Sequence, residues 1–111
     1  MKETCLITGA IGHLGPVVVK KLIEEGYAVK VFARQNSPIE VLSGLEVEFA
    51  FGDITDRKSI DNALLNVDIV IHAAALIDIS NLKVEEMKQV NFVGTKNILD
   101  ASIEKGIKKF V

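Results

Sequence analysis

The chain has 111 residues, of which 49% are apolar and 25% are charged, so it can build the core of one small domain and is not a disordered segment. Its net charge is −2 and it contains no block of basic residues, which argues against nucleic acid as its main partner. No apolar run approaches the roughly 20 residues that span a bilayer, and the first residues lack the apolar stretch of a signal peptide. Cys5 is the only cysteine, which leaves no intrachain disulfide and no cysteine metal cluster. We expect a cytoplasmic protein without a membrane partner.

The first predicted strand ends in a cluster of glycines. Residues 5–7 are apolar and indicate a buried strand, and Gly9, Gly12 and Gly15 follow before an apolar helix pattern begins. A strand, a glycine loop and a helix in this order offer backbone N–H groups and a helix N-terminus to a phosphate. The glycines would provide a tight turn, room for a pyrophosphate and close helix–strand contact. Their Gly-x-x-Gly-x-x-Gly spacing differs from the common Gly-x-Gly-x-x-Gly, so the prediction rests on their context.

The predicted helix after the glycines covers residues 13–25. At about 100° per residue, its apolar side chains share one face. These side chains are Val18, Val19, Leu22 and Ile23. Gly15 lies near the middle of this face, where the missing side chain lets the helix approach the sheet, and Gly26 ends the helix.

Strands and helices alternate along the rest of the chain. The remaining predicted strands cover residues 28–33, 47–51, 68–75 and 109–111. The remaining predicted helices are a short turn at 39–43, a helix capped by Thr55 or Asp56, and a long helix at 83–105. This alternation implies right-handed crossovers, and therefore an α/β fold with a doubly wound parallel sheet that is incomplete after the start of the fifth strand.

Folds of this kind bind ligands beyond the carboxyl ends of their strands, where the strand order reverses. The candidate site residues all lie at the carboxyl end of a predicted strand. They are the glycine loop 9–15, Arg34, Asp53 and Ala73–Ala75. We therefore expect a nucleotide site at this edge of the sheet.

Four stretches of the chain resemble the extended short-chain dehydrogenase/reductase family. They are TGAIGHLG (8–15), GDITD (52–56), HAAA (72–75) and NFVGTKN (91–97). The family includes nucleotide-sugar epimerases and dehydratases, 3β-hydroxysteroid dehydrogenases and dihydroflavonol reductases, and the likeness covers the whole chain. The resemblance implies that residues 1–111 are the N-terminal part of an NAD(P)-binding Rossmann domain, with the substrate-binding part outside them.

The resemblance also gives roles to single residues. It implies that the pyrophosphate is lined by Gly9, Ile11, Gly12, His13, Leu14 and Gly15. Asp53 and Ile54 would flank the adenine, and Ala73, Ala74 and Ala75 would run beside the ribose and the phosphates. For Asp53 the alternative is a turn-capping role alone.

The residue at the end of the second predicted strand bears on the choice of cofactor. NAD sites place an acid there, about 20 residues beyond the glycines, which accepts hydrogen bonds from the ribose. This chain has Arg34 instead, and a guanidinium suits a 2′-phosphate through paired charge-assisted hydrogen bonds. We favour NADP(H) over NAD(H), the alternative being that Arg34 is an ordinary exposed arginine.

Two further polar residues have both a structural and a catalytic interpretation. His72 is expected at the end of a buried strand with its ring hydrogen-bonded, rather than as a catalytic base. Asn91 is expected to be a hydrogen-bonded amide on the buried face of the long helix, with a supporting role in a proton relay as the alternative.

Catalysis in the resembled family uses a Tyr-x-x-x-Lys pair, which is missing here. The only tyrosine is Tyr27 and Val31 stands four residues on, so no catalytic residue can be assigned. We expect the cofactor-binding segment of a longer oxidoreductase that transfers hydride to or from a carbonyl or secondary alcohol, inactive on its own. The alternatives are a nucleotide-sugar epimerase or dehydratase with bound NAD, and a non-catalytic NAD(P)-binding sensor or scaffold.

Phe92, Leu99 and Ile103 form a second apolar stripe on the long helix. In the resembled family this helix often helps to form a dimer. The stripe is therefore either a homodimer interface or a face that the rest of a longer protein would cover.

Overall fold

The computed structural model describes residues 2–12, 14–73 and 84–111, and for residues 84–91 it describes the backbone only. The strands are β1 (Thr4–Thr8), β2 (Ala28–Ala33), β3 (Val47–Phe51), β4 (Ile69–His72) and β5 (Lys109–Phe110). The helices are α1 (Gly15–Glu24), the 3-10 helix η1 (Ile39–Leu42), α2 (Arg57–Ala63) and α3 (Val84–Glu104).

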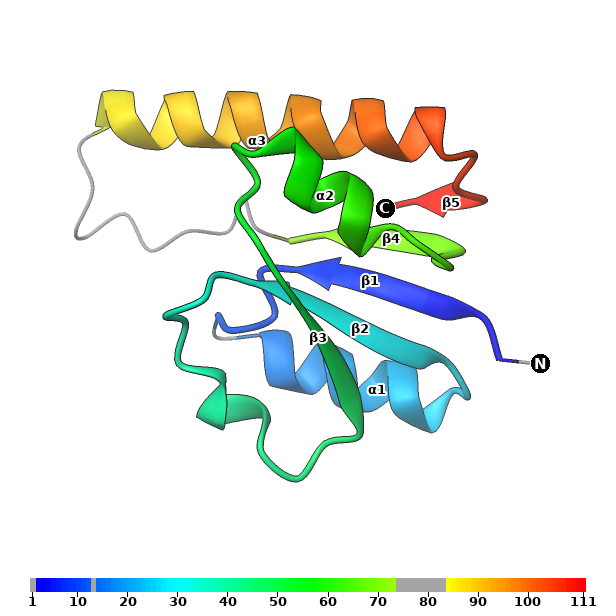
Figure 1. Cartoon of the computed structure of the whole chain (residues 1–111). Helices are drawn as coiled ribbons and strands as arrows, with labels where there is room; N and C mark the ends of the chain where they lie inside the picture. The colour runs from blue at the N-terminus through cyan, green and yellow to red at the C-terminus, as the bar shows by residue number, and fades with distance from the viewer. Residues whose placement is uncertain (1, 13, 74–83) are drawn as a thin grey trace.

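The strands form one parallel sheet in the order β3-β2-β1-β4-β5. Helix α1 covers one face of this sheet, and α2 and α3 cover the other (Figure 1). The chain builds outward from β1 in one direction through β2 and β3, and then returns to add β4 and β5 on the other side. The predicted doubly wound parallel sheet is confirmed, and its order reverses beside β1.

Because both faces are covered, the central strand β1 is apolar at three successive positions, 5–7, rather than at alternate ones. Leu6 belongs to the apolar cluster under α2 and α3, and its neighbour Ile7 belongs to the cluster under α1. Both side chains are at most 1% exposed. The unbroken apolar run at residues 5–7 therefore reflects a strand buried on both sides.

The predicted elements are all present, with differences at their ends. Helix α1 starts at Gly15 rather than at residue 13, and it ends before Gly26, whose φ of +94° suits a glycine. Of the two predicted caps of α2, the structure selects Asp56, whose carboxylate accepts a hydrogen bond from the amide of Lys58. Strand β4 begins at Ile69, and the carboxylate of the preceding Asp68 accepts a hydrogen bond from the amide of Thr4.

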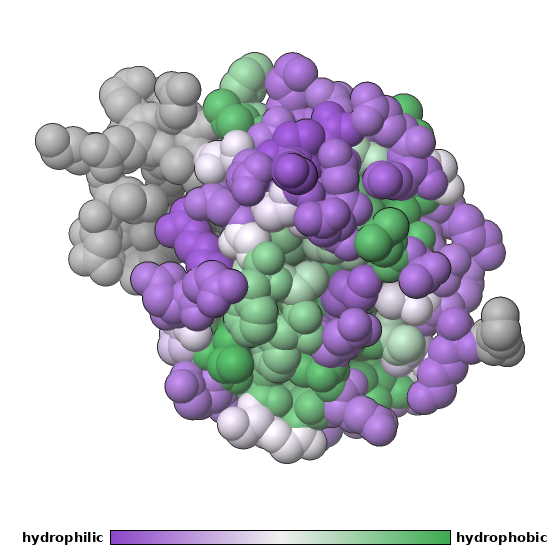
Figure 2. Space-filling view, in the orientation of Figure 1, coloured by the Kyte–Doolittle hydropathy of each residue, from purple (hydrophilic) through white to green (hydrophobic). Residues whose placement is uncertain are grey.

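Apolar side chains also remain at the surface. Figure 2 shows them gathered over the edge strand β3, where Phe49 and Phe51 stack with their ring centroids 5.8 Å apart. On α3, Phe92 and Ile103 are about 70% exposed, which agrees with the predicted second stripe. Among the described residues, no helix combines the length and the apolar composition needed to cross a membrane.

Candidate functional site

The glycine loop that follows β1 folds as two successive turns. The amide of Gly12 donates to the carbonyl of Gly9 at 3.2 Å, and the amide of Gly15 donates to the carbonyl of Gly12 at 3.1 Å. Gly9 has a φ of +79°, a backbone conformation that other residues rarely adopt, so it makes the tight turn out of the strand.

The other two glycines differ in the space around them. A Cβ atom on Gly15 would lie 1.7 Å from the carbonyl oxygen of Ala10, so only a glycine lets α1 pack against the end of β1. A Cβ atom on Gly12 would meet only the carbonyl oxygen of Gly9, at an ordinary 3.5 Å. The surface beside Gly12 is therefore open, as a loop that receives a ligand requires.

Backbone donors are available at this loop. Among the described residues, no acceptor takes the amides of Ile11 and Leu14, and no side chain caps the start of α1. Leu14 is the N-cap of that helix, so the partial positive charge of the helix N-terminus adds to the donors. Uncapped amides at a helix N-terminus next to an open glycine are suited to an anionic group.

A second loop lies at the same edge, after β3. The Oδ1 atom of Asp53 accepts from the amide of Thr55 at 2.9 Å and from its hydroxyl at 2.7 Å. These two hydrogen bonds, followed by the charge of Arg34, hold the pKa of Asp53 below its usual value. Asp53 is therefore ionised at neutral pH. Its backbone is fixed by Ser59, whose hydroxyl accepts from the Asp53 amide and lies within hydrogen-bond distance of the Asp53 carbonyl.

Arg34 is exposed immediately after β2, in a turn closed by Ser37. The strands that precede Arg34 and Asp53 pair, with Ala33 opposite Phe51 and the amide of Gly52 donating to the carbonyl of Ala33 at 2.9 Å. The fold therefore brings these two predicted site residues, 19 positions apart in the sequence, to neighbouring strand ends. An exposed guanidinium beside a carboxylate can donate hydrogen bonds to a 2′-phosphate or to a sugar hydroxyl, or it can be an ordinary surface arginine without a ligand.

His72 ends β4 beside the glycine loop, and its ring is hydrogen-bonded on both sides. Its Nδ1 lies 2.8 Å from the hydroxyl of Thr8, and its Nε2 lies 3.0 Å from the hydroxyl of Thr95 on α3. Burial lowers the pKa of His72, so the ring is neutral at pH 7. Next to it, the amide of Ala73 donates to both the carbonyl and the hydroxyl of Thr8. The predicted hydrogen-bonded ring is confirmed.

Two residues at this site were missed by the sequence analysis. Thr95 bonds to His72, and the amide nitrogen of Asn97 donates to the carbonyl of Ile54 at 2.9 Å. The available signal was the stretch NFVGTKN (91–97), which contains both residues beside Gly94, on the face of α3 that includes the buried residue Ile98. Of the predicted site residues, His13, Ala74 and Ala75 lie outside the described residues, as does the side chain of Asn91.

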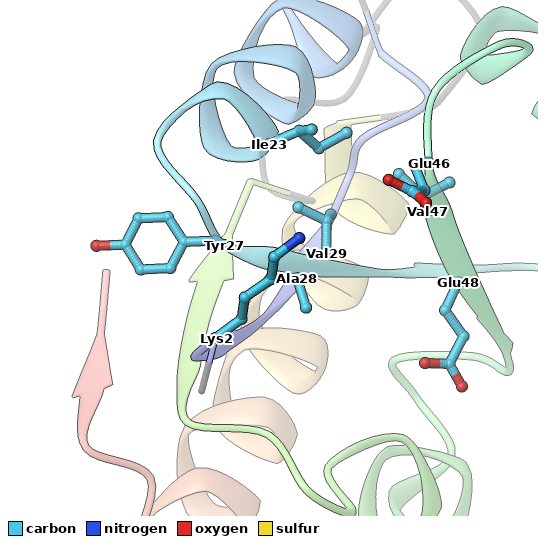
Figure 3. A pocket seen from close by; sticks show the side chains of 8 residues that line it. All are labelled: Lys2, Ile23, Tyr27, Ala28, Val29, Glu46, Val47 and Glu48. Carbon is cyan, nitrogen blue, oxygen red and sulfur yellow. The ribbon is translucent and has the colours of Figure 1, made fainter.

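The opposite edge of the sheet carries a shallow pocket of about 290 Å³ with no predicted site residue. It is lined by the side chains of Lys2, Ile23, Tyr27, Ala28, Val29, Glu46, Val47 and Glu48 (Figure 3). In that view Tyr27 extends away from the other labelled side chains. This tyrosine therefore lies at the amino ends of the strands, remote from the glycine loop.

Known proteins are similar to this chain in both sequence and fold. A model of the 3-beta hydroxysteroid dehydrogenase/isomerase family matches residues 6–111. "Sterol demethylase protein B" of Methylococcus capsulatus is 40% identical over 108 residues, which cover 97% of this chain and 33% of that protein. Human "Sterol-4-alpha-carboxylate 3-dehydrogenase, decarboxylating" is 36% identical over 109 residues, which cover 98% of this chain and 28% of that protein.

A solved structure of Thermus thermophilus UDP-glucose 4-epimerase in complex with NAD matches with a TM-score of 0.81 and 26% identity. The match covers 96% of this chain and 36% of the epimerase, so the chain spans about a third of the length of each of these relatives. The resemblance to the extended short-chain dehydrogenases/reductases is confirmed. Because the family model extends over nearly all of its residues, the chain belongs to the 3-beta hydroxysteroid dehydrogenase/isomerase family.

Proposed function

We propose that residues 1–111 form the dinucleotide-binding part of an NAD(P)-dependent oxidoreductase that acts on a carbonyl or secondary alcohol. The observation that carries this proposal is the glycine loop: a turn at Gly9, an open surface at Gly12 and a close helix contact at Gly15. It lies at the carboxyl edge of the sheet beside the strand where the order reverses. The names of the sterol relatives and the NAD complex of the epimerase support the same assignment.

In this proposal the described residues bind the diphosphate, the adenine and the ribose of the dinucleotide, and none of them is assigned to its nicotinamide. The amides of Ile11 and Leu14 bind the diphosphate over Gly12, and Asp53 and Ile54 flank the adenine. Ala73 runs beside the ribose and phosphates. The same family resemblance adds His13 and Gly15 to the diphosphate residues and Ala74 and Ala75 to the ribose residues. When bound, the nicotinamide would supply or accept the hydride.

The proposal is tested by calorimetric titration of the 111-residue chain with NADH and NADPH. Gly12→Ala leaves the fold intact, because its Cβ has room, but it fills the space that the diphosphate needs. We expect binding to weaken by about tenfold or more, which corresponds to at least about 1.4 kcal/mol. Lys20→Ala, exposed on α1, is the matched control and should bind like the wild type. Equal affinity of the Gly12→Ala variant and the wild type would refute the proposed site.

For the cofactor we propose a preference for NADP(H), which rests on Arg34. Its exposed guanidinium can pair with a 2′-phosphate through two hydrogen bonds. Arg34→Ala should therefore weaken NADPH binding by about tenfold and leave NADH binding within about twofold. Lys30→Ala, on the same strand, is the control because Lys30 bonds to the carbonyls of Ala63 and Leu65 instead. An unchanged NADPH/NADH ratio in Arg34→Ala would leave no role for this residue in selection.

The epimerase match favours a second candidate, a nucleotide-sugar epimerase or dehydratase that keeps its NAD bound. Both candidates need a proton donor at the substrate oxygen, and the described residues offer none near the glycine loop, since His72 is enclosed by Thr8 and Thr95. We therefore expect the 111-residue chain to bind cofactor without turnover. Reduction of a carbonyl substrate by the purified chain would contradict that expectation.

We also propose that the stripe of Phe92, Leu99 and Ile103 on α3 pairs two copies of the protein. All three side chains are exposed on one helix. Sedimentation of the wild type should show a dimer, and Ile103→Lys should shift it towards the monomer. Lys105→Glu, nearby and exposed but outside the stripe, is the control. A wild-type chain that sediments as a monomer over the whole concentration range would remove this part of the proposal.

A further inference from the structure

Helix α3 is connected to the glycine loop by a chain of side-chain contacts. The hydroxyl of Thr95 lies 3.0 Å from His72 Nε2, and His72 Nδ1 lies 2.8 Å from the hydroxyl of Thr8. Thr8 is completely buried and directly precedes Gly9, the residue that turns the chain into the loop. The position at which β1 ends is therefore tied to α3 through the ring of His72.

The same contacts join the exits of the two central strands. The amide of Ala73, the first residue after β4, donates to the hydroxyl of Thr8 at 3.1 Å. The Thr8 hydroxyl thus meets both the ring and the backbone that follows it. A neutral imidazole can donate from one nitrogen and accept at the other, so it can connect two hydroxyl groups without introducing a charge.

The second loop of the site is held by the same helix. The side-chain amide of Asn97 donates to the carbonyl of Ile54 at 2.9 Å. Three positions earlier on this face, Gly94 leaves room for the Ile54 side chain, because a Cβ atom there would lie 2.3 Å from its Cδ1 atom. Residues three apart lie on one side of a helix, so Gly94 and Asn97 both contact Ile54 from the same side of α3.

We propose that α3 positions the two loops of the dinucleotide site relative to each other, Thr95 acting through His72 on the glycine loop and Asn97 acting directly on the Asp53–Ile54 loop. This inference rests on the proposed function. Thr95, His72 and Asn97 are positioning residues, since their contacts are to protein groups. The diphosphate and adenine ends of one ligand need both loops at a fixed separation, and a loop that is only partly in place reduces the apparent affinity in proportion.

The test compares single hydrogen bonds on one helix. Thr95→Val removes the hydroxyl and keeps the shape, Thr95→Ser restores it, and Asn97→Ala removes the second bond. Ser102→Ala is the matched control, because Ser102 is buried on α3 and its hydroxyl donates only within the helix, to the carbonyl of Ile98 at 2.7 Å. Dissociation constants for NADH, ADP and adenosine are measured by titration with each variant of the 111-residue chain.

We expect Thr95→Val to weaken the binding of NADH and of ADP by about fivefold, and the binding of adenosine by less than about twofold. Asn97→Ala should weaken all three ligands by about fivefold, because the adenine end is common to them. Thr95→Ser and Ser102→Ala should bind like the wild type. If Thr95→Val and Asn97→Ala bind like Ser102→Ala, the inference is overturned although the proposed function stands. If the wild type binds neither NADH nor NADPH, the proposed function itself has failed.

A measurement on the ligand-free chain tests the inference independently of cofactor binding. In amide NMR spectra, Thr95→Val should move the resonances of Gly9 and Gly12, and Asn97→Ala should move those of Ile54 and Thr55. The His72→Asn variant should reproduce the effect of Thr95→Val, and the double variant should show no further change because the two residues act in one chain. Additive effects, or shifts confined to α3, would contradict the proposal even for a variant of reduced stability.

Discussion

The two faces of the sheet are each approached by a helix at a glycine, but the two contacts are of different kinds. On the α1 face, Gly15 lies against backbone, the carbonyl group of Ala10. On the α3 face, Gly94 lies against a side chain, the Cδ1 and Cγ1 atoms of Ile54. At Gly15 an added side chain could not be accommodated, because the backbone of Ala10 cannot move without displacing the strand end. At Gly94 an added side chain could be accommodated by a rotation of the Ile54 side chain.

This difference separates the two loops of the candidate site. The turns of the glycine loop are shaped by the path of the chain itself, at Gly9 and Gly12, and the side chains of Thr95, His72 and Thr8 act only on the strand end that precedes them. The Asp53 loop is shaped by side chains, since Thr55, Ser59 and Asn97 supply the hydrogen bonds that fix it. We therefore expect the fold to tolerate no side chain at Gly15 beside the diphosphate end of the site, and the adenine end to be adjustable.

The largest predicted effect is that of Gly15→Ala. The new Cβ would overlap the carbonyl of Ala10, so α1 would have to move away from β1. We expect a loss of about 3 kcal/mol in the free energy of unfolding, measured by urea denaturation, together with loss of cofactor binding. Gly12→Ala is the control for a methyl group in the same loop and should leave stability almost unchanged. A stable Gly15→Ala variant would mean that the helix does not lie where the structure has it.

Gly94→Ala should lower the free energy of unfolding by less, about 1 kcal/mol. Ile54 can rotate away from the new methyl group, and the higher helix propensity of alanine offsets about 1 kcal/mol of the remaining strain. The double variant Gly94→Ala/Ile54→Val removes the Cδ1 atom that the new methyl group meets. It should therefore be more stable than the sum of the two single changes indicates. Additivity of the two changes in urea denaturation would show that Gly94 and Ile54 are not in contact.

The same distinction explains what the sequence could and could not predict. Glycine spacing, strand ends and capping residues are local signals, and they predicted the sheet, the glycine loop and the cap of α2 as one of two neighbouring residues, Thr55 or Asp56. The side-chain ties of Thr95 and Asn97 depend on which face of α3 meets which loop. That is settled only when strands 60 or more residues apart pair, as β1 and β4 do through Thr8 and His72.

His72 gives a smaller, pH-dependent effect on the α3 side. Its pKa in the folded chain lies below the ordinary value of 6.5 because the ring is buried. Between the folded and unfolded pKa values the unfolded chain binds more protons, so the stabilisation present above about pH 6.5 is lost as the pH falls through the folded pKa. The free energy of unfolding should therefore decrease from pH 7.5 to pH 5.5.

The control for this prediction is the second histidine. His72→Asn should lose most of that pH dependence, whereas His13→Asn should retain it. The pKa of Asp53 is lowered, so that carboxylate does not titrate in this interval. Unfolding curves with equal pH dependence in wild type and His72→Asn would show that the ring is not buried as described.

The smallest effect is expected for the charged contact between the two helices on the α3 face. Arg57 on α2 bonds to Asp61 at 3.1 Å on its own helix and pairs with Glu104 on α3, and these contacts, that with Asp61 first, raise its pKa. Glu104 is 69% exposed, so water and salt weaken the pair, and the apolar cluster around Ile60 and Ile98 remains the main connection between the helices.

Glu104→Gln should lower the Tm by little more than the error of the measurement, and the difference should vanish in about 0.5 M salt. Asp100→Asn is the matched control, because it breaks the Lys96–Asp100 pair within α3 alone. If Glu104→Gln lowered stability as much as Gly94→Ala, charge rather than apolar packing would hold α2 to α3. The α3 face would then differ from the α1 face in how it is held together, and not only in how closely its helix approaches.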